Sequence, residues 1–337
     1  MEREKAFVRT SILAFAALAC TTTNGMKGKD RPTAPSHHTY EKMDGSGVVL
    51  YPESPERNIV LSFQRFFFEH GEYDSYRMIY PGEDGRAQVA HLRMPTHPSC
   101  LPAAIVFPIR GRDTYVSEAL ARLLASRGYA TVRLERGALP LRYSSDAQEV
   151  AEILSQALSD ARRIIDWFET RPEVNAKRIV TAGVSLGGIM GATLAGIDER
   201  VSGGFFIMPG GGLPEILYDS EDETVIGFVR RVMNRRELRS RSDFIAHAEP
   251  LTRETDPLTY ASRVDPRHVL LVSARFDSVI HEERTRVLWE GLGKPTWIRV
   301  PSGHVSIFPF FWWAAGKGID HLDRVLLEGE TEHCRAE

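Results

Sequence analysis

The stretch "RIVTAGVSLGGIMGATLAG", residues 178–196, joins a short apolar run to a glycine-rich segment around one serine. The run has the length and composition of a buried strand, and a helix pattern follows the serine. Between them, Gly183 to Gly187 spell G-x-S-x-G. In this strand-to-helix context the motif predicts a sharp, strained turn that exposes Ser185 as a nucleophile. The backbone N–H of Leu186 would then be one oxyanion donor.

Glycines in such a stretch can also bind phosphate or allow close packing. A phosphate-binding loop would need G-x-x-x-x-G-K-[ST], or G-x-G-x-x-G after a strand, and neither pattern is found here. Close packing of a helix on a strand is a reasonable role for Gly188 and Gly191, but it leaves Ser185 without a role. The nucleophile interpretation is therefore preferred.

From about residue 75 the chain alternates between strand and helix patterns. Continuous apolar runs at 103–109 and 267–274 predict strands buried on both faces, and the amphipathic pattern at 145–172 predicts a long helix. This alternation predicts an α/β fold, with a mostly parallel, doubly wound sheet and helices on both faces. Ligands of such sheets bind beyond the carboxyl ends of the strands, so the residues that follow each strand are the candidates.

A serine hydroxyl becomes a good nucleophile when a histidine takes its proton and a carboxylate orients that histidine. Asp277 follows the strand predicted at 267–274, and His304 follows a strand predicted at 296–301. Ser185, Asp277 and His304 thus come in chain order at the ends of three strands. We predict that they form a catalytic triad.

Other acids and histidines compete for these roles. His281 and His321 fall on predicted helices and His333 lies in the polar tail, so all three are expected at the surface. Asp265 precedes its strand, which places it at the wrong edge of the sheet. Glu282 lies in the first turn of a predicted helix, where an acidic side chain is favourable without any catalytic role.

The second oxyanion donor is expected in the loop 110–113, directly after the strand at 103–109. The backbone N–H of Arg112 is favoured, and that of Arg110 is the alternative. Their guanidinium groups could bind an anionic substrate. Surface ion pairs with Asp113 or Glu135 are the simpler expectation.

Three segments resemble the α/β-hydrolase superfamily. Residues 160–188 are similar to the stretch that leads to the elbow in its dienelactone-hydrolase-like and acyl-esterase branches. "SARFDSVI" (273–280) and "PSGHVS" (301–306) resemble the acid and histidine segments. The arginine in "PIRG" (108–111) departs from the histidine that is common there, which leaves the oxyanion register open.

The resemblance implies the α/β-hydrolase fold and a serine hydrolase that cleaves carboxylic esters through a Ser–Asp–His triad. It implies no cofactor and no metal, and a small-molecule ester or lipid as substrate. Two alternatives remain: a catalytically silent hydrolase-fold protein that binds a lipid or partner at the cell envelope, or an acyltransferase that uses the same triad. The sequence does not indicate the oligomeric state.

Residues 213–262, here called the insertion, are longer than a helix and two loops require. Residues 222–248 within it have a helical pattern, with Val225, Phe228, Val229 and Val232 on one face. Insertions at this place in the superfamily form a lid over the site. A peripheral helical decoration is the alternative.

The apolar run "VSIFPFFWWAAG", residues 305–316, directly follows His304. It is too short to span a bilayer, which takes about 20 residues. It is interpreted either as the buried start of a final helix predicted at 317–329, or as an acyl-binding wall or interfacial patch beside the site.

The N-terminus has the pattern of a signal peptide, residues 1–19, with an apolar run that ends before Cys20. "ALAC" resembles a bacterial lipobox, in which Cys20 would carry the lipid anchor of an envelope lipoprotein. Plain export to the periplasm or medium is the alternative. Residues 20–40 are polar and predict a flexible tether, and 41–330 form the hydrolase domain.

The formal net charge of −3 provides no basic face for nucleic acid. Partners are therefore expected among small ester or lipid substrates and, through the anchor, the membrane. Cys100 and Cys334 lie far apart in sequence, and both are expected to be free thiols.

Overall fold

The computed structural model describes residues 45–54, 71–97, 100–110, 115–135 and 139–327. The chain divides into two compact units, Met1–Thr39 and Tyr40–Glu337, and every described residue belongs to the second. The predicted signal peptide, the tether, Cys20 and Arg112 lie outside the described residues.

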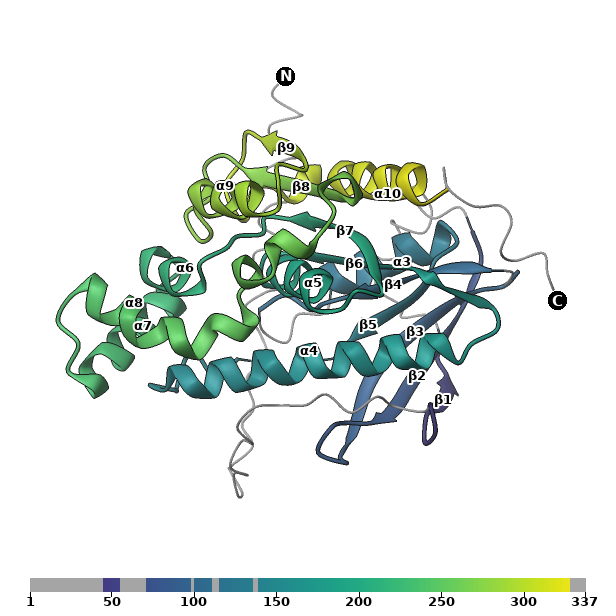
Figure 1. Cartoon of the computed structure of the whole chain (residues 1–337), viewed down its shortest axis with the longest axis horizontal. Helices are drawn as coiled ribbons and strands as arrows, with labels where there is room; N and C mark the ends of the chain where they lie inside the picture. The colour runs from purple at the N-terminus through teal and green to yellow at the C-terminus, as the bar shows by residue number, and fades with distance from the viewer. Residues whose placement is uncertain (1–44, 55–70, 98–99, 111–114, 136–138, 328–337) are drawn as a thin grey trace, which may run out of the picture. The chain divides into compact units, whose positions relative to one another are not determined.

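One mixed sheet organises the fold (Figure 1). Its strands in chain order are β1 (Val49–Pro52), β2 (Tyr73–Pro81), β3 (Ala87–Pro95), β4 (Leu101–Val106), β5 (Ala130–Leu134), β6 (Val174–Val184), β7 (Val201–Ile207), β8 (Val269–Ala274) and β9 (Thr296–Val300). They lie in the order β1-β2-β3-β5-β4-β6-β7-β8-β9. The neighbouring pairs β1–β2, β2–β3 and β3–β5 are antiparallel. Every later pair in this order, from β5–β4 to β8–β9, is parallel.

Helices cover both faces of the sheet, as the sequence predicts. One core joins the sheet to α4 (Ala147–Glu169), α5 (Leu186–Ile197) and α9 (Glu282–Gly291). A second core lies on the other face, beneath α3 (Tyr115–Ser126) and α10 (Phe311–Leu327). Strand β8 is buried at all six positions, which explains its continuous apolar sequence.

Local signals account for the longest helix. The side chain of Asp146 caps α4 by accepting a hydrogen bond from the N–H of Gln148 at 3.1 Å. The apolar stripe of α4 faces the sheet and ends at the buried Trp167 and Phe168. At the following turn the chain enters β6, which leads to Ser185.

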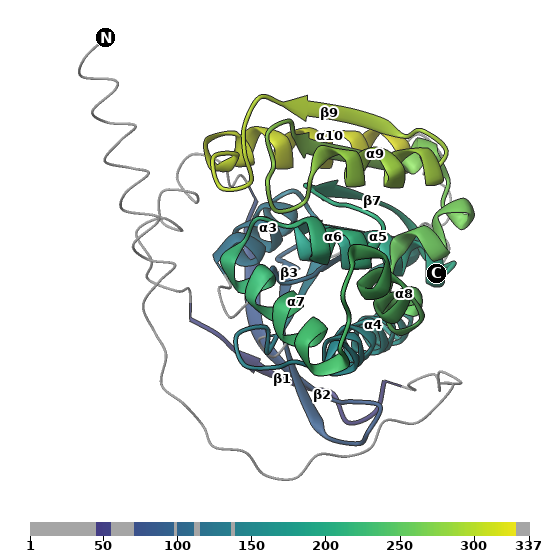
Figure 2. The ribbon, with the colours of Figure 1, turned by 90° about the vertical axis from the view of Figure 1, so that its left-hand side faces the viewer.

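The insertion differs from the single helical stretch that its pattern indicates at 222–248. It contains α6 (Leu213–Asp219), α7 (Glu223–Arg236), α8 (Arg241–Thr252) and the short 3-10 helices η1 (Arg253–Thr255), η2 (Pro257–Thr259) and η3 (Ala261–Arg263). The break comes where Glu237 takes the left-handed conformation, with φ of 55°. Ser240 and Asp243 then start α8 with a capping box. Figures 1 and 2 place α6, α7 and α8 beside one another at one end of α4.

The final helix begins earlier than predicted, at Phe311, after the short helix η5 (Phe308–Phe310). Phe311 and Ala314 are buried, so part of the run 305–316 is the buried start of α10. Phe310 and Trp313 are 39% and 47% exposed, so the run also presents apolar surface.

Cys100 is disulfide-bonded, so the expectation of a free thiol is wrong for this residue. Sequence separation does not set spatial separation in a folded chain. Cys20 and Cys334 lie outside the described residues. Within the described ranges, no helix combines the length and apolar character that a membrane span needs.

Candidate active site

Ser185 occupies a strained turn between β6 and α5. Its backbone has φ of 55° and ψ of −123°, a conformation that L-residues rarely adopt. The neighbouring glycines make the turn possible: a Cβ on Gly183 would lie 2.2 Å from the carbonyl oxygen of Gly187. A Cβ on Gly187 would lie 2.6 Å from the carbonyl oxygen of Phe107. The serine N–H donates to the carbonyl of Ile207 at 2.8 Å, which anchors the turn to β7.

A series of hydrogen bonds leads away from the serine. Ser185 Oγ lies 3.1 Å from His304 Nε2. His304 Nδ1 lies 2.9 and 2.8 Å from the two carboxylate oxygens of Asp277. An ionised carboxylate can only accept, so Nδ1 donates to Asp277, and Nε2 of the neutral ring is left to accept the serine hydroxyl. This is the arrangement in which a histidine can remove the proton of a serine.

Burial and backbone hydrogen bonds fix the position of the Asp277 carboxylate. The Asp277 side chain is 1% exposed and that of His304 is 18% exposed. Asp277 Oδ1 also accepts the N–H groups of Val279 and Ile280, at 2.8 and 2.9 Å. These bonds satisfy a buried carboxylate that would otherwise be costly. The N–H of Phe276 donates to the carbonyl of Ser302 at 2.9 Å, which ties the acid loop to the histidine loop.

The predicted oxyanion donors lie on two segments. Leu186 is the first residue of α5, so its N–H belongs to the unpaired donors of a helix start. Arg112 lies outside the described residues, and the choice between Arg112 and Arg110 stays open. The carbonyl of Phe107 approaches Gly187, so the chain that leaves β4 lies against the first turn of α5.

The Arg110 guanidinium binds the carboxylate of Asp222, 112 residues away, a partner that the sequence did not predict. Asp113 lies outside the described residues. The sequence carries one signal for Asp222, an acidic N-cap before the apolar stripe of α7. It carries no signal for the pairing itself, because the partners are so distant along the chain.

The competing residues lie elsewhere. His281 is the N-cap of α9 and its Nε2 lies 2.9 Å from the carbonyl of Asp219. His321, on α10, is 6% exposed, so the expectation of a surface histidine is wrong. Asp265 caps a short turn before β8, and Glu282 pairs with Arg299. His333 lies outside the described residues.

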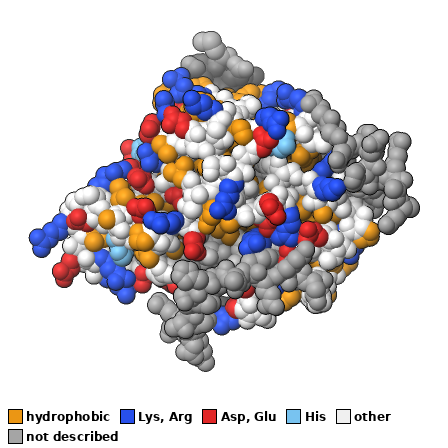
Figure 3. All heavy atoms as spheres, viewed as in Figure 1, with side chains coloured by type: hydrophobic (Ala, Val, Ile, Leu, Met, Phe, Trp, Pro, Cys, Tyr) orange, Lys and Arg blue, Asp and Glu red, His pale blue; other side chains and the backbone are white. Residues whose placement is uncertain are grey.

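Among the described residues, no group of three or more His, Cys, Asp or Glu side chains is arranged to hold a metal ion. Acidic and basic side chains alternate over the face shown in Figure 3, where the described residues form no continuous basic area.

Comparisons with known sequences give little information about the function of this chain. No family model matches the chain. Two uncharacterized proteins of Mycobacterium tuberculosis, MT2702 and Rv2627c, are 27% identical over 155 residues, which are 46% of this chain and 34% of each relative. The matched part thus spans about a third of the curated relatives.

Solved structures are more informative about architecture. An acetyl xylan esterase from Paenibacillus sp. R4 is 17% identical, with a TM-score of 0.55 over 77% of this chain and 83% of that one. Acetyl xylan esterase 1 from Thermoanaerobacterium sp. JW/SL YS485 is 16% identical, with a TM-score of 0.56 over 80% and 88%. The acylaminoacyl peptidase of Pyrococcus horikoshii is 16% identical, with a TM-score of 0.57 over 80% of this chain and 45% of that one. With the strand order and the two helix layers described above, these likenesses show that the chain has the α/β-hydrolase fold.

Proposed function

We propose that this chain is a serine hydrolase that cleaves carboxylic esters through an acyl-enzyme intermediate. The observation that carries the proposal is the hydrogen-bonded series Ser185–His304–Asp277, with the serine on a strained turn at a helix start. Nucleophile, base and orienting acid are the three parts that acyl transfer by serine requires.

In the proposed reaction, Ser185 Oγ attacks the ester carbonyl carbon while His304 Nε2 takes the hydroxyl proton. Asp277 keeps the ring oriented and stabilises the imidazolium that forms. The carbonyl oxygen becomes an oxyanion, which the N–H of Leu186 and one N–H from the chain after β4 receive. His304 then returns the proton to the leaving alcohol. Water attacks the acyl-enzyme, with His304 again as base, and releases the acid.

The nature of the acyl group and of the leaving group is a separate question. The similar structures include acetyl xylan esterases and a peptidase, so esters and acylated peptides are the two substrate classes to compare. We propose esters, because residues 160–188 resemble the stretch before the elbow in the dienelactone-hydrolase-like and acyl-esterase branches.

A fluorophosphonate probe followed by an ester panel tests this function. Wild type should be labelled at Ser185 and should hydrolyse p-nitrophenyl esters, whereas Ser185→Ala should do neither. Ser202→Ala is the matched control, since its hydroxyl bonds the carbonyl of Lys177. Unlabelled wild type, or labelled Ser185→Ala, would contradict the proposal. New ester formed with an added alcohol, in place of free acid, would instead assign an acyltransferase.

We also propose that the protein is exported and carries a lipid on Cys20. The support is the N-terminal sequence pattern alone. Mass spectrometry of the mature N-terminus tests it: a diacylglyceryl cysteine is expected in wild type and not in Cys20→Ser. An unprocessed N-terminus in wild type would contradict it.

A further inference from the structure

Arg110 and Asp222 form a two-pronged ion pair between the core and the insertion. Nη1 and Nη2 of Arg110 each lie 2.7 Å from one carboxylate oxygen of Asp222. The side chains are 34% and 24% exposed, so the pair is partly shielded from water. A planar guanidinium that faces both oxygens of a carboxylate constrains orientation as well as distance. This two-pronged ion pair between Arg110 and Asp222, here called the fork, fixes the chain that leaves β4 relative to the start of α7.

The same carboxylate also caps α7. Asp222 Oδ1 accepts the N–H groups of Thr224 and Val225, at 2.9 and 3.1 Å. With the two Arg110 bonds, Asp222 accepts four hydrogen bonds, which is about the capacity of a carboxylate. The fork and the helix cap therefore share one group, and neither can shift without disturbing the other.

The segment that carries Asp222 also contacts the acid loop. The N–H of Glu221 donates to the carbonyl of Ser278 at 2.8 Å, next to Asp277. The carbonyl of Asp219 lies 2.9 Å from His281 Nε2. Residues 219–222 thus touch the chain after β4 on one side and the chain after β8 on the other.

We propose that Arg110 is a positioning residue, whose fork to Asp222 sets residues 107–110 relative to the acid loop; these residues include the backbone N–H of Arg110, one of the two candidates for the second oxyanion donor. This inference rests on the proposed function. Arg110 is the third residue after Phe107, which lies against Gly187, so the two can be about 10 Å apart at most. Both Nη atoms already bind Asp222, so we assign the Arg110 fork to geometry and not to a substrate anion.

The test compares Arg110→Met, Asp222→Asn and the double variant. Asparagine keeps the cap of α7 but loses the charge, so Asp222→Asn isolates the fork. We expect kcat on p-nitrophenyl acetate to fall about 10- to 100-fold in each, since small misplacements near a reacting centre have effects of this size. KM should change little, and the double variant should be no slower than either single variant. Arg110→Lys keeps the positive charge but cannot form the fork, so its kcat should lie between those of Arg110→Met and wild type.

Arg241→Met is the matched control. Arg241 forms a similar fork with Asp219, at 2.9 and 2.6 Å, so it joins two parts of the insertion and does not bind the chain after β4. Its kcat should equal that of wild type. A boronic acid that mimics the tetrahedral state should bind Arg110→Met more weakly by the same factor as the loss in kcat, whereas the product acid should bind both proteins equally.

Hydrogen exchange separates failure of this inference from failure of the proposed function, because it needs no activity. Amides at 223–226 and 276–280 should exchange faster in Arg110→Met than in wild type or Arg241→Met. Equal exchange in all three proteins would overturn the inference. So would equal kcat in Arg110→Met and Arg241→Met when wild type is active. An inactive wild type with the expected exchange pattern would refute the ester hydrolase and leave the fork in place.

Discussion

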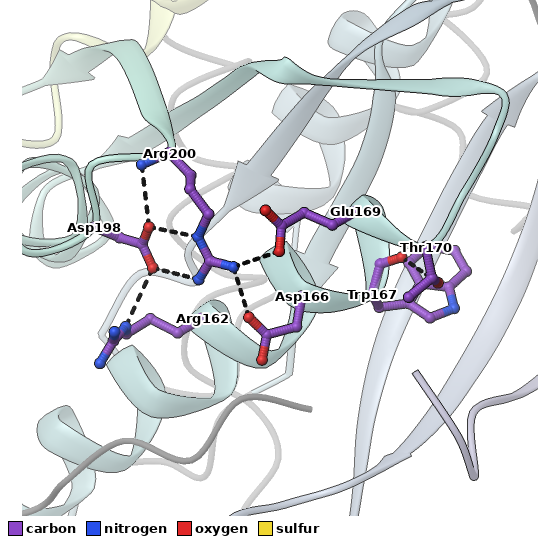
Figure 4. Close-up of polar contacts among 7 residues, drawn as sticks. All are labelled: Arg162, Asp166, Trp167, Glu169, Thr170, Asp198 and Arg200. Carbon is purple, nitrogen blue, oxygen red and sulfur yellow. Dashed lines mark hydrogen bonds and ion pairs between the residues drawn. The ribbon is translucent and has the colours of Figure 1, made fainter. Parts of the chain in front are cut away.

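The two ends of the parallel strands both carry buried carboxylates, and they use them differently. At the carboxyl ends, Asp277 faces one imidazole, and beyond it a serine. At the amino ends, Arg200 lies between Asp198, Asp166 and Glu169 (Figure 4). The hydrogen bonds of its guanidinium group are 2.7 to 2.8 Å long. Asp198 is further held by Arg162 at 3.2 Å.

The two groups of carboxylates differ in the basic side chain that they face, which is an arginine at the amino ends and a histidine at the carboxyl ends. Burial opposes the charge of Arg200, but its hydrogen bonds to Asp198 and Asp166 outweigh burial and raise its pKa further. An arginine cannot release a proton near neutral pH, whereas a histidine can. The amino-end cluster is therefore a permanent ionic clamp between α4 and the α5–β7 turn. The carboxyl-end series contains a group that can exchange a proton. A buried carboxylate alone does not distinguish a structural site from a catalytic one.

Asp277→Asn should have the largest effect. An amide in this place can hold the imidazole in the wrong tautomer, so we expect kcat to fall about 10⁴-fold, with the free energy of unfolding nearly unchanged. Ester hydrolysis and urea unfolding measure the two quantities. A loss below about tenfold would mean that the carboxylate is not the orienting acid.

Arg200→Met should show the opposite pattern. It leaves Asp166 and Asp198, which are 0% and 3% exposed at the side chain, without their main cation. We expect a loss of about 3–5 kcal/mol in the free energy of unfolding, with the kcat of the folded protein unchanged. Arg267→Met removes an exposed pair with Asp265 and should change stability by less than about 1 kcal/mol. Equal losses in the two variants would show that burial of the cluster is unimportant.

Asp160 sharpens the comparison, because it is a buried carboxylate that hydrogen-bonds Gln156 and not an arginine. Burial raises its pKa from 3.8 to about 6, although the Gln156 bond partly opposes this. A raised pKa means that the folded state binds the proton more tightly. The contribution of Asp160 to the free energy of unfolding is therefore full below about pH 4 and is lost as the pH rises through 6.

In Asp160→Asn this pH dependence should disappear. The free energy of unfolding of the variant, relative to wild type, should increase by about 2 kcal/mol between pH 4 and pH 7. Denaturant unfolding at both pH values checks this. Asp198 should behave in the opposite way: burial works against its charge, but the Arg200 hydrogen bonds outweigh that and lower its pKa. Its contribution is lost only as the pH falls below about 4. A constant difference between Asp160→Asn and wild type would refute the prediction.

The smallest effect is expected from the apolar surface after His304. Phe310→Ser and Trp313→Ser should lower kcat/KM for octanoyl esters by about three- to tenfold relative to acetyl esters, if these side chains contact long acyl chains. Tyr51→Ser, on edge strand β1, is a control that also removes an exposed aromatic side chain. Equal effects on short and long esters would leave this surface without a role in acyl selection. Phe311 is unsuited to the test, because it is 2% exposed and belongs to the core.

Local features of this molecule, and the meeting of residues placed at strand ends, could be predicted from the sequence, whereas the ion pair between Arg110 and Asp222 could not. The apolar patterns of β8 and the long helix α4 predicted an α/β architecture and the resemblance implied the α/β-hydrolase fold; both are confirmed. The structure also brings Ser185, Asp277 and His304 together, although their catalytic role stays a prediction. The break between α7 and α8 was visible in principle as the S-x-x-D of the capping box at Ser240. The start of α10 was hidden, because the run 305–316 is apolar throughout.

Chain order in the sheet has a further consequence for biosynthesis. Ser185 and His304 are separated by 119 residues, and the histidine follows the last strand, β9. Domains form from the N-terminus as chains are made, and contacts across long loops come late. The strained serine can thus be in place while its base is still missing. The proposed nucleophile would lack its base in any intermediate in which the chain after β9 is still unfolded.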